Sequence, residues 1–379
     1  MTGARNYADS HPVIRVSAKR FDASPFLHRY VTDEAVLGVY GGRLYPLSLG
    51  ADPVEDYRHL RERAALYDVP ERPLQVEGPD AERLLNLVLA RDVTTLAPGK
   101  ARYAIACDDR GGILMDGVLI RWSPDRFWYV LADGEFVGWL QAHAAGMEVT
   151  ISDPGSWVLQ VQGPTSLAIF QDLCDGAAPD PFPYFAVAEV RMGGQPVGVS
   201  RTGWSGELGF EIYTLPGVDG SALWDHINAA GAAHGLAVQA LESLGIRRIE
   251  AGILDNGTDM DPTMTPFAAG LGRFVDLDKP EFLGREALTV ADRRPVMFGL
   301  TGGSTPVAGT DVRLDGAVVG RVTAGAWSPF LERGIGYVRM REPGEWVGTE
   351  VRGAEDAGFG VVGLPFYDAE RAIPRGLAG

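Results

Sequence analysis

The chain has 379 residues, of which 46% are hydrophobic and 22% charged, and its formal net charge is −16. This composition predicts a soluble globular protein of two or three domains, and its acidity excludes a nucleic-acid partner, because phosphate binding needs a basic surface. No apolar run reaches the roughly 18 residues of a membrane span, and the first seven residues lack the apolar core of an export signal.

These features together predict a cytoplasmic protein without a membrane segment. The two cysteines, Cys107 and Cys174, are far apart in the chain and predict reduced thiols rather than a disulfide. The six histidines show no spacing typical of metal ligands, so we expect no metal site.

In chain order, the first predicted element is a helix over residues 53–67, which carries apolar side chains on one side and mostly charged ones on the other. The next elements predict one compact α+β module over residues 72–150. They are a strand at 74–76, a helix at 80–89 that begins with Asp80 as N-cap, a hairpin around Asp116, a strand at 126–131 and a helix at 136–145.

A second module begins at residues 157–164 and repeats the earlier order of strand, Gly-Pro turn and helix, with the helix at 166–173. The elements predicted after it are strands at 186–192, 197–200 and 209–213 and helices at 221–235 and 238–252. From residue 296 onward, short strands alternate with glycines, which is typical of a small β-barrel or sandwich. A helix at 284–292 lies in the segment that joins the two parts.

Asp116 is a chemical signal because it interrupts an apolar strand, between Ile113-Leu114-Met115 and Val118-Leu119-Ile120. A carboxylate in such a strand must be satisfied by partners or serve a function. An aspartate at the rim of the hairpin is the structural alternative, and the strand alone does not decide between them.

A second signal is the segment 200–213, where three glycines surround Trp204 and Glu211 follows in a strand. Glycines let backbone approach a flat ligand closely, and a carboxylate can accept two hydrogen bonds from an amino-amide edge such as that of a pterin. Strand alternation also allows Glu211 to lie on the surface. The segment is no phosphate loop, because it lacks the lysine and the strand-turn-helix context.

Many collinear motifs show a resemblance over most of the chain, from about residue 55 onward. They are Tyr67-Asp68-Val69, Gly99-Lys100-Ala101-Arg102-Tyr103, Gly111-Gly112 with Asp116, Gln162-Gly163-Pro164, residues 200–207, Phe210-Glu211, Arg248-Ile249-Glu250-Ala251, Asp259-Met260-Asp261, Thr265-Pro266-Phe267, residues 282–288 and residues 320–329. With these motifs the chain resembles the folate-dependent aminomethyltransferase superfamily, which comprises the glycine-cleavage T-protein and its tetrahydrofolate-dependent demethylase relatives.

Within that superfamily, several segments are more similar to dimethylsulfoniopropionate demethylase than to T-protein. They are residues 56–60, Ala132-Asp133, residues 270–274 and Leu364-Pro365-Phe366. T-protein usually carries an asparagine near Ala132 and an arginine in place of Leu244. The demethylase loop usually reads Ser-Lys-Gln-Gly-Gly, whereas residues 205–209 read Ser-Gly-Glu-Leu-Gly, so the donor stays open.

The resemblance implies an α+β fold, a three-domain cloverleaf of the aminomethyltransferase type with a C-terminal β-barrel. Its first, folate-binding domain would be discontinuous, over residues 1–71 and 151–275, the inserted second domain would cover 72–150, and the barrel would cover 280–379. The resemblance also implies tetrahydrofolate as cofactor. Its binding residues would be Glu211 at the pterin edge and, along the rest of the folate, Tyr103, Tyr184, Trp204 and Phe185, with Asp116 as the catalytic residue beside the reactive nitrogens.

The activity so implied is transfer of a methyl group from a small sulfonium, N-methyl or O-methyl donor to N5 of tetrahydrofolate. Alignment of donor and acceptor contributes roughly 7–11 kcal/mol to such a reaction, and a fixed carboxylate stabilises the charge that gathers on N5. Two alternatives stay open, an aminomethyltransferase that forms 5,10-methylenetetrahydrofolate and a folate-binding relative without catalytic activity. The partners we expect are therefore tetrahydrofolate and a small donor, and the sequence does not decide between monomer and homodimer.

Overall fold

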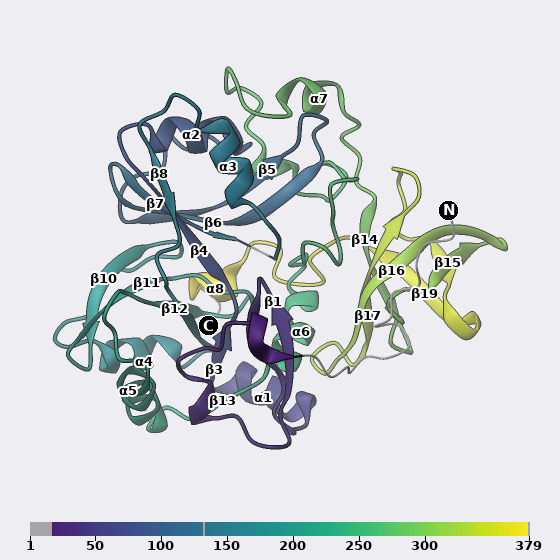
Figure 1. The fold of residues 1–379 in the computed structure, drawn as a ribbon. Coiled ribbons are helices and arrows are strands. Elements are labelled where there is room, and N and C mark those ends of the chain that lie inside the picture. Colours follow the sequence, from purple (N-terminus) through teal and green to yellow (C-terminus); the bar gives the residue numbers. More distant parts are fainter. Residues whose placement is uncertain (1–16, 132, 378–379) are drawn as a thin grey trace.

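The computed structural model describes residues 17–131 and 133–377, and Figure 1 shows their strands grouped into four sheets. One is an open six-stranded sheet of order β10-β11-β12-β9-β3-β13. Its strands are β3 (Ala64–Val69), β9 (Val158–Gln162), β10 (Val187–Met192), β11 (Gln195–Ser200), β12 (Gly209–Thr214) and β13 (Leu236–Val238). Only β13 pairs in parallel, with β3, and the other pairings are antiparallel.

A five-stranded antiparallel sheet of order β5-β6-β7-β4-β8 forms the second layer of the body. Its strands are β4 (Arg72–Glu77), β5 (Lys100–Cys107), β6 (Ile113–Ser123), β7 (Arg126–Leu131) and β8 (Thr150–Ser152). Helices α2 (Ala81–Val88) and α3 (Val137–His143) pack on one face of it around a shared apolar core. A separate core joins this sheet to the six-stranded one, with Ile120 and Trp128 against Val158 and Tyr213.

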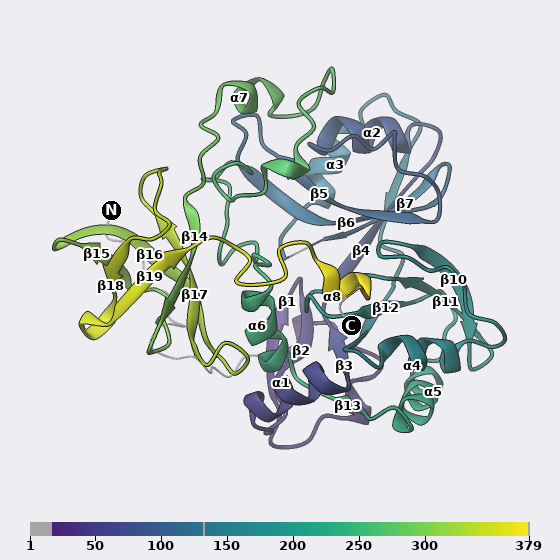
Figure 2. The same cartoon turned by 180° about the vertical axis from the view of Figure 1, so that it is seen from behind.

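The C-terminal region contains a closed six-stranded barrel, which lies apart from the two sheets in Figures 1 and 2. Its strands are β14 (Met297–Gly302), β15 (Asp311–Leu314), β16 (Ala317–Ser328), β17 (Arg333–Met340), β18 (Glu350–Arg352) and β19 (Gly358–Val362). The α+β class and the C-terminal β-barrel are thus confirmed. We retain the division at residues 71, 150 and 280 as a proposal.

The remaining helices are short and cover the six-stranded sheet or connect it to the barrel. They are α1 (Pro53–Glu62), α4 (Ser166–Leu173), α5 (Gly220–Ala232), α6 (Leu241–Glu250), α7 (Arg285–Val290) and α8 (Ala372–Arg375), with 3-10 turns η2 (Ala18–Arg20), η3 (Leu27–Arg29), η4 (Gly272–Phe274) and η5 (Ala354–Asp356). No helix in the described ranges is both long and apolar enough to cross a membrane. The predicted absence of an export signal concerns residues that lie outside these ranges.

The prediction of one helix over residues 53–67 is wrong in its second half. Helix α1 ends at Glu62, and Ala64–Val69 forms β3, which is buried at every position. A strand in the middle of a sheet has both faces covered, so it reads as a continuous apolar run without alternation. The apolar residues assigned to a helix face belong instead to the sheet core.

Two further differences concern short strands. The predicted helix over 238–252 is α6, which begins only at Leu241, because Leu236–Val238 pair with β3 as strand β13. The hairpin of β1 (Val36–Tyr40) and β2 (Arg43–Ser48) has no counterpart among the predicted elements. It turns at Gly41 and Gly42, which both have positive φ and so suit glycine.

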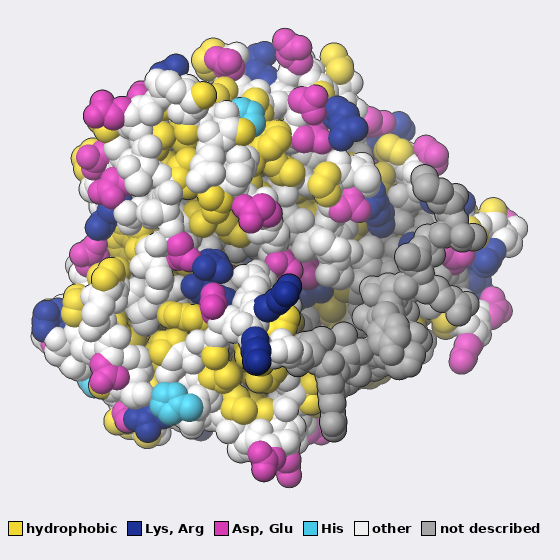
Figure 3. All heavy atoms as spheres, in the orientation of Figure 1, with side chains coloured by type: hydrophobic (Ala, Val, Ile, Leu, Met, Phe, Trp, Pro, Cys, Tyr) yellow, Lys and Arg dark blue, Asp and Glu magenta, His cyan; other side chains and the backbone are white. Residues whose placement is uncertain are grey.

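Both cysteines are free thiols. Cys107 is buried and Cys174 partly so, in line with the prediction of reduced cysteines. On the face drawn in Figure 3, acidic side chains are scattered widely, while several basic side chains lie near the middle.

Candidate functional site

Asp116 lies on β6 of the five-stranded sheet, opposite Ile105 of β5. Its side chain accepts a hydrogen bond from the Tyr103 hydroxyl at 2.9 Å and another from the Asn256 amide at 3.1 Å. Asp116 is only 8% exposed. Two donors therefore satisfy a buried carboxylate that the apolar strand would otherwise leave unpaired.

Burial raises the pKa of Asp116 to about 6. The hydrogen bonds from Tyr103 and Asn256 act in the opposite direction, and the nearby carboxylate of Asp255 adds to the rise. Asp116 is therefore mostly ionised at neutral pH, but it takes up a proton under mildly acidic conditions. A perturbed pKa in a buried, hydrogen-bonded group is typical of functional sites.

Tyr103 is held from two sides. Its hydroxyl donates to Asp116, and its ring meets the ring of Phe274 edge-on, with centroids 4.7 Å apart. Phe274 belongs to η4, so a segment close to the barrel positions a side chain of the five-stranded sheet. Tyr103 and Asp116, both selected from the sequence, are therefore in direct contact.

Glu211 lies on β12 of the six-stranded sheet and is only 6% exposed. One carboxylate oxygen, Oε2, accepts from the hydroxyls of Thr202, Tyr213 at 2.7 Å and Ser200 at 3.3 Å. The other, Oε1, accepts from Gln160 Nε2 at 2.9 Å. Burial still raises the pKa of Glu211, although the hydroxyls oppose that rise. Three hydroxyls thus fix one oxygen and leave Oε1 as the one with capacity for a further donor.

Beside Glu211, two buried side-chain oxygens have no hydrogen-bond partner within the described residues, the acceptor Gln160 Oε1 and the Glu71 carboxyl oxygen Oε2. Burial, followed by the charge of Glu211, raises the pKa of Glu71 to about 8. Unpaired buried acceptors are costly and call for an explanation such as a bound donor. Glu211 Oε1 and Gln160 Oε1 together suit a ligand edge with adjacent N–H donors, which a pterin amino-amide edge provides.

The other three predicted folate residues form different contacts. Tyr184 and Phe185 meet edge-on with ring centroids 4.5 Å apart, and the charge of Glu211 contributes to the raised pKa of Tyr184. The Arg248 guanidinium lies 5.1 Å from the Trp204 ring centroid. Within the described ranges, no hydrogen bond or ring contact joins Trp204 to Asp116 or Glu211.

The hairpin of β1 and β2 contributes side chains that sequence reasoning missed. Burial raises the pKa of Tyr40, and the nearby charges of Asp255, Glu71 and Asp116 raise it further. In the hairpin turn, the Gly41 amide donates a hydrogen bond at 2.8 Å to the Asp133 side chain, which lies in the loop after β7. Tyr40 therefore lies close to the carboxylates of both clusters.

Gln160, Asn256, Glu71 and Tyr40 are the residues that the sequence analysis did not select. None carries a local motif that distinguishes it from an ordinary strand or loop residue. Only Gln160 had a signal in the sequence, because it is a polar residue that alternates with apolar ones in a strand. In the structure that strand pairs with the strand of Glu211, and Gln160 lies directly opposite Glu211.

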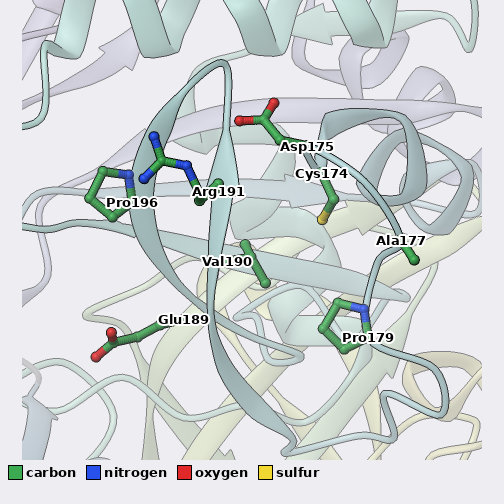
Figure 4. Close-up of a pocket in the computed structure, with 8 residues that line it drawn as sticks. All are labelled: Cys174, Asp175, Ala177, Pro179, Glu189, Val190, Arg191 and Pro196. Carbon is green, nitrogen blue, oxygen red and sulfur yellow. The ribbon is translucent and has the colours of Figure 1, made fainter.

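Two surface pockets differ in their relation to these clusters. A pocket of about 460 Å³ lies at the edge of the six-stranded sheet, between β10 and the segment after α4, and is lined by residues such as Cys174 and Arg191. Figure 4 shows that none of its labelled residues is a predicted site residue. A second pocket, of about 420 Å³, includes both Tyr184 and Phe185.

Comparisons with known proteins agree with this architecture. Residues 28–279 match the model of the GCVT N-terminal domain, and residues 293–368 match that of the glycine cleavage T-protein C-terminal barrel domain. The chain is 35% identical over 357 residues to an aminomethyltransferase of Streptomyces coelicolor, an alignment that covers 89% of this chain and 95% of the relative.

Two further proteins are similar to this chain, one in sequence and one in structure. A trimethylamine-oxide aldolase of Ruegeria pomeroyi is 33% identical over 349 residues, 86% of this chain but only 44% of that protein. The crystal structure of the glycine cleavage system aminomethyltransferase T of Bartonella henselae has a TM-score of 0.82 at 26% identity, covering 92% of this chain and 98% of that one. The chain therefore belongs to the glycine-cleavage T-protein (GCVT) family, as its motifs predicted.

Proposed function

We propose that this chain is a tetrahydrofolate-dependent one-carbon transferase of the aminomethyltransferase type, whose product is 5,10-methylenetetrahydrofolate. The observation that carries the proposal is the pairing, in a chain of this family, of a buried hydrogen-bonded Asp116 with a buried Glu211 next to unpaired acceptors. The aminomethyltransferase relatives support this reaction better than methyl transfer to N5, which the sequence alone favoured. Of the two positions at which the chain departs from the usual T-protein residue, Ala132 lies outside the described residues and Leu244 is buried in α6.

In this proposal Glu211 and Gln160 bind the pterin. Glu211 Oε1 and the unpaired Gln160 Oε1 accept the N–H donors of the amino-amide edge, and Tyr103, Tyr184, Phe185 and Trp204 contribute aromatic surface. Folate supplies the two nitrogens that accept the carbon. A hydrogen bond to a charged carboxylate contributes about 1.5–3 kcal/mol, which is enough to orient the ring system.

Asp116 would act on the reacting side. Its ionised carboxylate stabilises positive charge that develops on a nitrogen during the transfer, and with a pKa of about 6 it can also accept a proton. Tyr103 and Asn256 hold the carboxylate in one orientation and favour its ionised form. A preorganised charge of this kind needs no rearrangement as the reaction proceeds.

The relatives' names guide the choice of donor. Aminomethyl transfer and trimethylamine oxide both concern a carbon bonded to nitrogen. We therefore propose, as the first candidate, a donor that delivers a nitrogen-bonded carbon at the oxidation level of formaldehyde, as an aminomethyl group or an amine N-oxide can. Sulfonium and O-methyl compounds are the second group of candidate donors, because they are donors in the alternative reaction, methyl transfer to N5 of tetrahydrofolate.

A donor panel with mass spectrometry of the folate product tests the proposal. The purified protein is mixed with tetrahydrofolate and, separately, a protein-linked aminomethyl donor, N-methyl amines, trimethylamine oxide, a sulfonium and an aryl methyl ether. A methylene product gains one carbon atom, whereas a methyl product gains one carbon and two hydrogens. We expect the methylene product from the aminomethyl donor, whose carbon is already at the oxidation level of formaldehyde, or from trimethylamine oxide, whose N–O bond accepts the two electrons as its methyl carbon reaches that level. N-methyl amines have no such oxidant and should give no methylene product.

The other results are equally informative. A methyl product would replace our reaction with the demethylase alternative. Tight tetrahydrofolate binding without turnover on any donor would favour a non-catalytic folate-binding protein. Asp116→Asn is the matched control, because it should reduce product formation about 100-fold or more without abolishing binding.

A further inference from the structure

Glu71 carries a buried carboxyl group to which the proposed function gives no role. It lies in the connection between β3 and β4, where the Arg43 guanidinium donates to its backbone carbonyl at 2.8 Å. Its oxygen Oε1 is 3.5 Å from Gln160 Nε2, and its other oxygen, Oε2, is buried without a hydrogen-bond partner within the described residues. A buried polar atom without a partner costs free energy, so Oε2 is a candidate contact for a bound molecule.

The Gln160 side chain links Glu71 to Glu211. Its nitrogen Nε2 donates to Glu211 Oε1 at 2.9 Å and to Glu71 Oε1 at 3.5 Å. An amide nitrogen has two hydrogens, so these two bonds use both of them. Gln160 therefore lies between the two carboxyl groups, and the register of β9 with β12 places it directly opposite Glu211.

The two carboxyl groups differ in how well a negative charge is stabilised. Like charges that share a buried site are not both ionised at low cost. Three hydroxyls donate to Glu211 Oε2, whereas no hydroxyl donates to the Glu71 carboxyl within the described residues. Burial, followed by the charge of Glu211, raises the pKa of Glu71 to about 8. Glu211 is thus the group that ionises, and Glu71 holds its proton at neutral pH.

The other charged and titratable groups around Glu71 do not reverse this assignment. After burial and Glu211, the charge of Arg43 on β2 lowers the pKa of Glu71, and that of Asp68 on β3 raises it. Tyr40 on β1 and Tyr213 on β12 also face Glu71, whose charge adds to the effect of burial and raises the pKa of both. Among the described residues, no cation forms an ion pair with the Glu71 carboxyl, because Arg43 donates to the backbone carbonyl instead.

We propose that Glu71 binds the pterin as a neutral carboxylic acid and donates its O–H to the carbonyl oxygen of the pterin ring. This inference rests on the proposed function, in which Glu211 Oε1 and Gln160 Oε1 accept the N–H donors. The amino-amide edge presents an amino N–H, a ring N–H and then a carbonyl oxygen. The row Glu211, Gln160, Glu71 offers two acceptors and then one donor, in the same order. Glu71 would thus make the site specific for a carbonyl group at that ring position.

Calorimetry with tetrahydrofolate between pH 7 and 9 tests the inference in the wild-type protein, Glu71→Gln and Glu71→Leu. Glutamine offers an N–H donor that does not titrate, and leucine removes the donor. Glu77→Gln is the matched control, because Glu77 lies on β4 and is exposed. Titration in two buffers of different ionisation enthalpy also counts the protons taken up on binding, and the melting temperature shows whether each variant is folded.

We expect the affinity of the wild-type protein to fall about tenfold from pH 7 to 9, because the fraction of Glu71 that carries a proton falls by that factor around a pKa of about 8. At pH 9 its binding should take up about one proton. Glu71→Gln should take up none and stay within about twofold of the wild-type affinity at pH 7 throughout. Glu77→Gln should follow the wild-type protein, and Glu71→Leu should bind about fivefold or more weakly at pH 7.

Three results would overturn the inference. They are a wild-type affinity that does not change with pH, the same decline in Glu71→Gln as in the wild-type protein, and a Glu71→Gln variant that binds as weakly as Glu71→Leu. Each leaves the proposed function in place as long as the wild-type protein binds tetrahydrofolate, whereas failure to bind it at any pH would overturn both. If Glu71→Leu does not fold, the wild-type protein and Glu71→Gln decide the inference by their pH dependence and proton uptake.

Discussion

The two buried carboxylates of this protein are held in different ways. Glu211 accepts hydrogen bonds from four side chains of its own sheet and the segment next to it. Asp116 accepts two, and one of them comes from Asn256, which is 140 residues away in the chain. Glu211 is therefore fixed by local structure, whereas Asp116 depends on how a distant loop is placed.

This difference suits different tasks. A carboxylate with one oxygen saturated by hydroxyls is a fixed acceptor, which is what recognition of a ligand edge requires. A carboxylate with fewer donors and a pKa of about 6 can change protonation near neutral pH, which is what a reacting site requires. The predictions below test that contrast, beginning with the largest expected effect.

Replacing Asp116 with asparagine should reduce turnover about 100-fold or more and leave tetrahydrofolate affinity nearly unchanged, because an electrostatic or acid–base contributor is lost. Burial raises the pKa of Asp116 above its usual 3.8, so the folded state binds the proton more tightly and the ionised side chain costs stability above about pH 6. The melting temperature at pH 8 should therefore be kept or raised. A lower melting temperature with full activity per folded molecule would show that Asp116 is structural.

Replacing Glu211 with glutamine should weaken tetrahydrofolate binding about tenfold or more, since a charged hydrogen bond contributes about 1.5–3 kcal/mol. Calorimetry measures the affinity, and circular dichroism checks the fold. Glu189→Gln on β10 is the matched control, because Glu189 is exposed and pairs with Arg126. Unchanged affinity in Glu211→Gln would remove this residue from the site.

Replacing Asn256 with alanine should shift the acidic limb of the activity profile to higher pH. The Asn256 amide lowers the pKa of Asp116, so its loss raises that pKa above about 6 and reduces the ionised fraction at pH 7. Turnover should fall severalfold at pH 7 and recover at higher pH. Asn228→Ala on α5, where the amide donates to the Trp224 carbonyl, should leave the profile in place. A uniform loss at every pH would contradict this role of Asn256.

The smallest expected effect concerns Glu71 and stability. Its pKa is raised from 4.5 to about 8, so the folded state retains the proton and the free energy of unfolding should decline as pH rises toward 8. Glu71→Gln should flatten that decline, most clearly between pH 7 and 8, where Asp116 with its pKa of about 6 is already mostly ionised. Urea unfolding at several pH values measures it, and parallel curves for both proteins would show that Glu71 is ionised throughout.

Much of the fold could be predicted from local sequence. The helix at Ser166–Leu173 and the strand at Arg126–Leu131 agree with their predicted bounds, because side-chain period and flanking turns define them. The family motifs also indicated the barrel. Prediction from the local pattern failed at β3, because a strand covered on both faces does not alternate apolar with polar residues. It also failed at β13, which is too short to show such alternation.

For the site, the sequence by itself determined which carboxylates matter, because Asp116 interrupts an apolar strand and Glu211 follows a glycine-rich loop. It could not determine what satisfies them. Asn256, Gln160, Tyr40 and Glu71 come from four separate segments, and their neighbours in space are set by the packing of two sheets and a hairpin. Hydrogen bonding and burial depend on these long-range contacts, and so do the pKa values, which only the tertiary structure decides.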